Sequence, residues 1–204
     1  MTALTFAIGG ISYWMPRYLM YRTNLSLGQV NFYFGVILVI TGIVATLLGG
    51  FLGDWFQKRH SGAYFIVSAC GIFIATPLIV LLLYVPFPFA WGVIFLAVFF
   101  LFFNTGPSNA ILANVTHPSV RAAAFGLNIF IIHLLGDAIS PPILGVIVGD
   151  TANPQWDSAL LAVACVTALA GVLWLLGAKH LGRDSENARE TPPGGGFPVI
   201  PLND

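Results

Sequence analysis

The chain contains six long apolar runs, each separated from the next by a short turn of polar residues, glycine or proline. The runs lie near residues 2–21, 30–55, 63–84, 88–113, 121–148 and 158–179. A helix needs about 20 apolar residues to cross a hydrocarbon core of about 30 Å, and each run is long enough. The runs do not alternate between apolar and polar positions, as the strands of a membrane barrel would. The sequence therefore predicts an all-α membrane protein with six transmembrane helices within residues 1–180.

The charges exclude several other classes of protein. Charged residues make up 8% of the chain, whereas about 25% is usual in soluble domains. Eight Lys and Arg balance eight Asp and Glu, so the basic excess that binds nucleic acid is missing. Cys70 and Cys165 both lie inside apolar runs, which predicts neither a disulfide framework nor a metal cluster. We expect no metal and no cofactor.

The basic residues predict the orientation of the helices. With six spans, Lys58, Arg59, Arg121, Lys179, Arg183 and Arg189 fall on the side of the C-terminus, and only Arg17 and Arg22 fall opposite. Cytoplasmic loops carry the excess of Lys and Arg, so we expect both termini in the cytoplasm of a cell-membrane protein. Residues 181–204 are polar and then rich in Pro and Gly, which predicts a disordered cytoplasmic tail.

The start of the chain lacks the features of a signal peptide. Met1 enters the first apolar run directly, with no basic segment and no small-residue cleavage site before Arg17. We expect either a span whose insertion is controlled by later loops or, as the favoured alternative, a chain that begins within a longer one.

Polar residues inside the fourth and fifth runs are the candidate site. Such groups are costly at membrane depth and mark functional sites by default. The fourth run carries Asn104, Thr105 and Ser108, and Pro107 frees the carbonyl group of Phe103 for another partner. The fifth run carries the remaining three, Asn128, His133 and Asp137, of which the last two are four residues apart and share a helical face.

The depths of these residues suggest one shared cavity. With a rise of about 1.5 Å per residue, the polar groups of the two antiparallel helices fall at similar levels, as a water-filled hollow requires. The alternative is that they hydrogen-bond from helix to helix, and it stays open for Asn104, Ser108 and Asn128. For Asp137, the only acid deep in a span, a functional role is favoured.

An enzyme is disfavoured. One His and one Asp are too few for zinc, which binds roughly three or four protein ligands. The spacing also nominates no nucleophile beside His133.

Glycines form a row on the second run. Gly35, Gly42 and Gly49 are seven residues apart and Gly53 follows four residues later, so they lie on one narrow stripe. Small residues let another helix approach closely. We expect close static packing here, with a sliding contact as the alternative.

The end of the second run resembles motif A of the major facilitator superfamily, which lies between the second and third helices of each six-helix half. The matching residues are Gly50, Asp54, Lys58 and Arg59, although Trp55 and Gln57 depart from the usual pattern. The resemblance implies a cytoplasmic gating latch in which Asp54 meets a neighbouring helix N-terminus. Independently, an acid at the C-terminal end of its own helix favours a donor from elsewhere.

The fifth run resembles the eleventh helix of the spinster-like branch of that superfamily. The similarity lies in residues 121–128 and 133–141, and residues 104–107 and 14–16 fit the same branch. It covers about residues 1–180 and implies the C-terminal six-helix half of a twelve-helix secondary transporter. Members of this branch move lipids, which implies a lipid-like or amphipathic solute.

The resemblance also implies partners and site roles. Tyr13 and Trp14 would contact an apolar tail, and the Asn, His and Asp residues a polar head. Because a transporter of this class rocks two halves around a midplane site, we expect an N-terminal six-helix half or a second copy as partner. The alternative is a non-transporting membrane subunit, or a truncated fragment, that associates with a partner six-helix bundle.

Overall fold

The computed structural model describes residues 1–150 and 152–190, and these are almost entirely helical, without a β-strand among them. The elements are α1 (Thr2–Arg22), α2 (Leu27–Gln57), α3 (Ala63–Leu81), α4 (Ala90–Phe102), α5 (Thr105–Asn114), η1 (Pro118–Val120), α6 (Arg121–Ile132), η2 (His133–Asp137), α7 (Ser140–Val148), α8 (Trp156–Gly177) and α9 (Leu181–Glu190). The predicted spans match α1, α2, α3, α4–α5, α6–α7 and α8 to within a few residues at each end. The all-α, six-helix fold is therefore confirmed.

Five of the six spans are long and apolar enough to cross a membrane by length and composition alone. The exception is α1, which is 21 residues long but carries Arg17, Pro16 and several small or polar residues. It still buries a continuous apolar side in the bundle, formed by Leu4, Ala7, Ile11, Met15 and Leu19.

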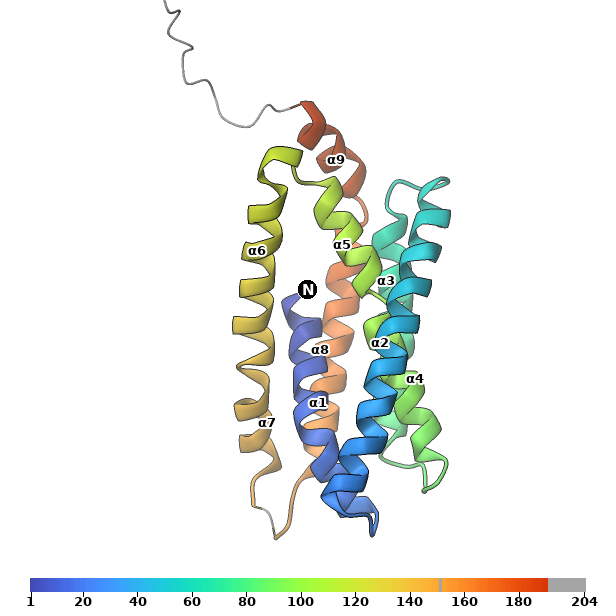
Figure 1. The fold of residues 1–204 in the computed structure, drawn as a ribbon, viewed down its shortest axis with the longest axis vertical. Coiled ribbons are helices and arrows are strands. Elements are labelled where there is room, and N and C mark those ends of the chain that lie inside the picture. The colour runs from blue at the N-terminus through green and yellow to red at the C-terminus, as the bar shows by residue number, and fades with distance from the viewer. Residues whose placement is uncertain (151, 191–204) are drawn as a thin grey trace, which may run out of the picture.

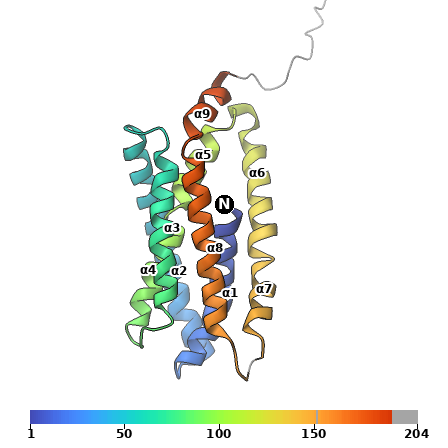
Figure 2. The ribbon, with the colours of Figure 1, turned by 180° about the vertical axis from the view of Figure 1, so that it is seen from behind.

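The helices stand side by side in an elongated bundle (Figure 1). On one face α1 and α5 lie between α2 and the α6–α7 span, and the opposite face shows α3 and α8 (Figures 1 and 2). Burial is uneven. In the apolar windows of α3, α4–α5 and α8, 44% of the residues are buried, against 17% in α2 and 22% in the span from η1 to α7. The two spans that flank the face with α1 and α5, namely α2 and the α6–α7 span, are thus the least buried.

Two spans are interrupted near proline. The fourth breaks between α4 and α5, three residues before Pro107, whose missing N–H leaves the carbonyl group of Phe103 without its helical donor. The fifth contains the π-helical turn η2, in which the N–H of Ala138 donates to the carbonyl of His133 at 2.9 Å. Pro141 and Pro142 open α7 and remove the donors that would continue a regular helix.

Polar side chains fasten the C-terminal end of α1 to α3. The Tyr18 hydroxyl donates to the carbonyl of Leu82 at 3.1 Å. The guanidinium of Arg22 donates to the carbonyls of Leu83 and Val85, both at 3.3 Å. These carbonyl groups lie just beyond the last residue of α3, so the bonds fix the start of the α3–α4 connection to α1.

The opposite end of the bundle carries the α2–α3 loop, the α5–α6 connection and α9 (Figure 1). The expected disorder of the tail is wrong for its first ten residues, which form α9. Leu181 is 2% exposed, and Gly182 lies against Ser61 of the α2–α3 loop. This one buried leucine anchors an otherwise polar helix. The rest of the predicted tail, residues 191–204, lies outside the described residues.

Candidate functional site

The predicted polar residues of the fourth span form a closed local cluster. The Ser108 hydroxyl donates to Oδ1 of Asn104 at 3.1 Å, and Nδ2 of Asn104 donates to the carbonyl of Leu101. Asn104 is 5% exposed and Ser108 is 1% exposed. Their hydrogen bonds therefore run along their own span, at the break between α4 and α5, rather than from helix to helix.

The polar residues of the fifth span form a second, exposed cluster. Nδ1 of His133 and Oδ2 of Asp137 are paired within η2. The two side chains are 59% and 36% exposed. Among the residues that the structure describes, this is the only direct contact between a basic side chain and an acidic one. The prediction that His133 and Asp137 share a helical face is confirmed.

Glycines bring α1 directly against this pair. A Cβ atom on Gly9 would lie 2.5 Å from Oδ1 of Asp137, and one on Gly136 would lie 2.8 Å from Cβ of Thr5. Nearby, the indole N–H of Trp14 donates to the carbonyl of Pro141 at 2.9 Å. The acid is thus held beside the backbone of α1. This contact was not predicted from the sequence, although Gly9-Gly10 in the first run was its visible signal.

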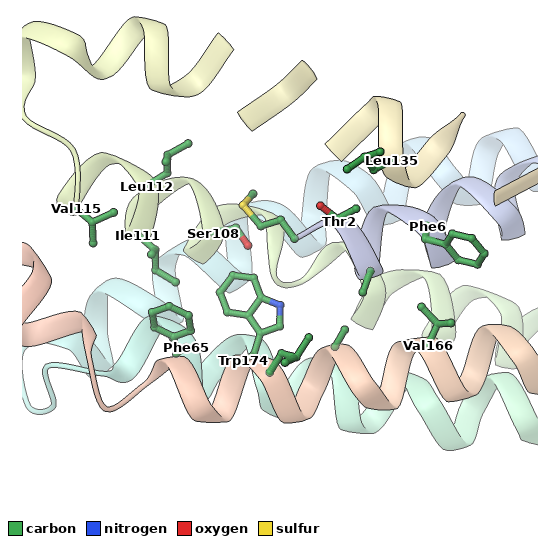
Figure 3. Close-up of a pocket in the computed structure, with 14 residues that line it drawn as sticks. Thr2, Phe6, Phe65, Ser108, Ile111, Leu112, Val115, Leu135, Val166 and Trp174 are labelled. Carbon is green, nitrogen blue, oxygen red and sulfur yellow. The ribbon is translucent and has the colours of Figure 1, made fainter. Parts of the chain in front are cut away.

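A cavity of about 620 Å³ lies between the two clusters, bounded by α1, α3, α5, η2 and α8. Figure 3 shows Ser108, Leu135 of η2 and the ring of Trp174 of α8 on different sides of it. Its size is in the range of small-molecule sites. Its lining is apolar except for the hydroxyl-bearing residues Thr2 and Ser108 and the chain start.

This cavity differs from the predicted water-filled hollow. Of the predicted site residues only Ser108 lines it. Asn104 is occupied by its local hydrogen bonds, and neither His133 nor Asp137 lines the cavity. The polar groups at similar depths in sequence therefore do not converge within this one bundle, because each cluster is satisfied on its own helix. Their role in binding a solute stays a prediction.

The other predicted site residues lie on α1, α5 and α6. Tyr13 of α1 is 57% exposed, and its ring meets that of Trp14 at a centroid distance of 5.4 Å. Trp14 in turn packs edge-on against Trp156. Thr105 begins α5, and Asn128 lies on α6, each half-buried.

The residues of the predicted latch make local contacts at the loop-bearing end of the bundle. The hydroxyl of Tyr64, in the first turn of α3, donates to Oδ1 of Asp54 at 2.7 Å. The acid thus has a donor from a neighbouring helix, as expected, but from a side chain. The guanidinium of Arg59 lies 4.7 Å from the ring of Trp55, and Lys58 caps α2.

Gly50 lies at the same end of the bundle. A Cβ atom on Gly106 of α5 would lie 2.7 Å from the backbone nitrogen of Gly50, so α2 and α5 touch backbone to backbone.

The described residues contain no group of three His, Cys, Asp or Glu side chains that could hold a metal ion.

Sequence comparisons relate the chain to one group of transporters. It is 30% identical over 182 residues to spinster homolog 2 of Arabidopsis thaliana, covering 86% of this chain and 35% of that protein. It is 30% identical over 219 residues to spinster homolog 3 of Mus musculus, covering 96% and 42% respectively. It is 27% identical over 218 residues to the sphingosine-1-phosphate transporter of Xenopus tropicalis, covering 94% and 42%. No protein-family model matches the chain.

The fold is similar to the crystal structure of a bacterial homologue of the human lysosomal transporter spinster, in an inward-facing and unoccupied conformation. The TM-score is 0.66 at 18% identity, and the match covers 94% of this chain and 48% of the other. The chain spans less than half the length of these relatives. Over most of its own length, the chain is a homologue of the spinster proteins of the major facilitator superfamily, and its six helices have the fold of about half of such a transporter.

Proposed function

We propose that this bundle is the C-terminal half of a secondary transporter that moves a lipid-like or amphipathic solute by alternating access. Support comes from the names of the relatives, one of which is a sphingosine-1-phosphate transporter. It also comes from the match to about half of a transporter fold. These relatives are transporters, which favours transport over an enzymatic role.

The observation that carries the proposal is the exposed His133–Asp137 pair. An acid inside a membrane span faces a bundle interior or a hydrated cavity, because lipid cannot solvate it. In this bundle the pair is exposed, and it belongs to one of the two least buried spans. A second six-helix bundle, either an N-terminal half or another copy, would cover it and enclose a cavity.

The two interrupted spans fit this role. Transporters of this type build midplane sites from discontinuous helices, whose irregular backbone lines the cavity. In our proposal the polar head of the solute meets His133, Asp137 and Asn128, with Asn104, Thr105 and Ser108 at the facing break. Tyr13 and Trp14 supply aromatic surface for the apolar tail.

The latch and the orientation complete the proposal. Gly50, Asp54, Lys58 and Arg59 would control opening at the end that carries α9. We propose that this end, with its surplus of basic residues, is cytoplasmic, and that the protein resides in the cell membrane with both termini inside.

The test is export of a fluorescent lysophospholipid from cells that make the chain together with its partner half. Asp137→Asn should lower the initial rate by at least about tenfold, because the neutral amide cannot replace the exposed acid. Asp157→Asn is the matched control, since Asp157 is an exposed acid in the first turn of α8. Surface levels are measured in parallel.

Two results would contradict the proposal. Equal export by wild type and Asp137→Asn would remove the acid from the mechanism. A stable complex with a second bundle that exports nothing, with or without these substitutions, would favour a non-transporting subunit.

A further inference from the structure

A second hollow lies away from the candidate site, on the outer side of α2, α3 and α4. It has a volume of about 310 Å³. Its walls are Leu52 and Phe56 of α2, Ile66 and Ile74 of α3, and the aromatic rings of Phe100 and Phe103 at the end of α4. Only His60 and Cys70 add other chemistry to the lining. It is an apolar groove at membrane depth.

Small residues create the groove. Ala63 is 2% exposed at its floor, and Gly71 leaves room where a Cβ atom would lie 3.0 Å from the ring of Phe103. Larger side chains of α3 border the groove. Two of them, Ile66 and Ile74, are each more than 40% exposed. The hollow is therefore a fixed feature of the helix packing and opens outward to the bilayer.

The length of the groove matches one leaflet. From Ala63 to Ile74 it runs along eleven residue-to-residue steps of α3, or roughly 16 Å at about 1.5 Å per step. Half of a hydrocarbon core of about 30 Å is about 15 Å. An alkyl chain that enters at the α2–α3 loop would thus lie in the groove along its whole length.

Basic side chains stand at the mouth. His60 lines the groove itself, and it follows Lys58 and Arg59, which are both exposed in the α2–α3 loop. Within the described residues neither of these two cations has an ion-pair partner. The nearest acid on the same segment, Asp54, is engaged by Tyr64. A hydrogen bond does not cancel the charge of a carboxylate, but Lys58 and Arg59 outnumber this one acid, so the mouth presents a net positive charge to a head group that lies there.

We infer that this groove binds a membrane phospholipid with an anionic head group, with one acyl chain between α2, α3 and α4 and its phosphate at the Lys58–His60 turn. Basic clusters at the ends of membrane helices select anionic head groups. An apolar chain matches the lining, whereas water would find no partners there. This site is separate from the proposed solute site and does not depend on it.

The first test uses the protein as it is. The chain has two cysteines, both exposed, and only Cys70 lines the groove. In detergent, phosphatidylglycerol should slow alkylation of Cys70 by N-ethylmaleimide severalfold and leave Cys165 of α8 unaffected. Phosphatidylcholine should protect Cys70 more weakly. Equal alkylation rates at Cys70 with and without phosphatidylglycerol would overturn the inference.

The second test distinguishes binding of the lipid head group from binding of the acyl chain. Native mass spectrometry of the purified protein should show phosphatidylglycerol retained over phosphatidylcholine, and Lys58→Gln with Arg59→Gln should reduce that preference by about fivefold per charge. Cys70→Trp should reduce retention of both lipids by filling the groove. The controls are Arg183→Gln, an exposed cation on α9, and Cys165→Trp. If the control variants lost as much lipid retention or lipid preference, the bound lipid would be non-specific and the proposed site would be overturned.

Discussion

The glycine row of α2 has two halves that are alike in sequence and different in surroundings. Gly49 and Gly53 are packed tightly: a Cβ atom on Gly49 would collide with the carbonyl oxygen of Phe103, and one on Gly53 would lie 2.7 Å from the ring of Tyr64. Gly35 and Gly42 have no atom within 4 Å of the same position. The expected close packing is thus correct for one half of the row only.

Helix geometry explains the difference. A step of seven residues rotates the row by about 20° in one direction, and a step of four rotates it by about 40° in the other. The buried side of α2 follows the four-residue step through Thr41, Ala45, Gly49 and Gly53. The two rows cross at Gly49 and diverge towards the start of the helix. Gly35 and Gly42 are left half-buried at the edge of the covered side, with open space where a side chain would extend.

The two halves of the row face different partners. The packed half holds α2 against the break between α4 and α5, where Pro107 has freed the carbonyl of Phe103 and only a glycine leaves room for that oxygen. The open half belongs to the least buried span. In our proposal it is where a second bundle approaches.

The largest expected effect comes from adding the same side chain to each half. Gly49→Val should lower the free energy of unfolding by about 3 kcal/mol more than Gly42→Val, because only the first collides with fixed backbone. Both substitutions place a β-branched residue in the same helix, so their intrinsic helix preferences cancel. The measurement is detergent-induced unfolding followed by tryptophan fluorescence. Equal losses would mean that the carbonyl of Phe103 does not lie against Gly49.

The same contact can be tested from the other helix. A Cβ atom on Gly106 would lie 2.5 Å from the carbonyl oxygen of Thr46 and 2.7 Å from the nitrogen of Gly50. Gly106→Ala should therefore destabilise the bundle by about 2 kcal/mol. Gly126→Ala in α6 is the control, since no atom lies within 4 Å of its Cβ position. An unchanged melting temperature for Gly106→Ala would show that α2 and α5 separate more easily than the contact implies.

The sequence was sufficient to predict the helices but not their interruptions. Apolar length set the six spans because every backbone group must be satisfied in the membrane. The π turn at His133–Asp137 packs against α1 at Gly9 and Gly136, and such a tertiary contact is not visible in the spacing of residues along the chain. The helix α9 was missed because a single buried leucine, Leu181, anchors a segment whose composition is polar.

The sequence predicted which residues of the candidate site pair with one another, but not how the pairs are placed in the bundle. The i,i+4 spacing correctly paired His133 with Asp137, and the same spacing pairs Asn104 with Ser108. Depth along two helices could not show which way each pair faces. That depends on the break and the π turn, which orient the two clusters separately. Whether they share a solute site stays a prediction.

A smaller effect is expected from a substitution at Tyr64 that separates its hydrogen bond from the packing of its ring. The ring of Tyr64 covers Gly53 and its hydroxyl donates to Asp54. Tyr64→Phe keeps the ring and removes the donor, so it should destabilise the bundle by about 1 kcal/mol. Tyr84→Phe is the control, because Tyr84 is 76% exposed. A loss as large as that of Gly106→Ala would place the main contribution of this contact in the latch rather than in the packing.

The smallest effect should have the opposite sign. Gly42→Ala adds a methyl group to open space, so it should raise the free energy of unfolding of the isolated bundle by about 0.5 kcal/mol through helix preference alone. The same change should weaken association with a second bundle that packs on this row, since close helix approach depends on small residues. Unfolding of the single bundle and cross-linking of the assembled pair therefore give opposite signs for one substitution. If both improve, the open half of the row faces lipid, and the partner must cover the His133–Asp137 pair from the α6–α7 side alone.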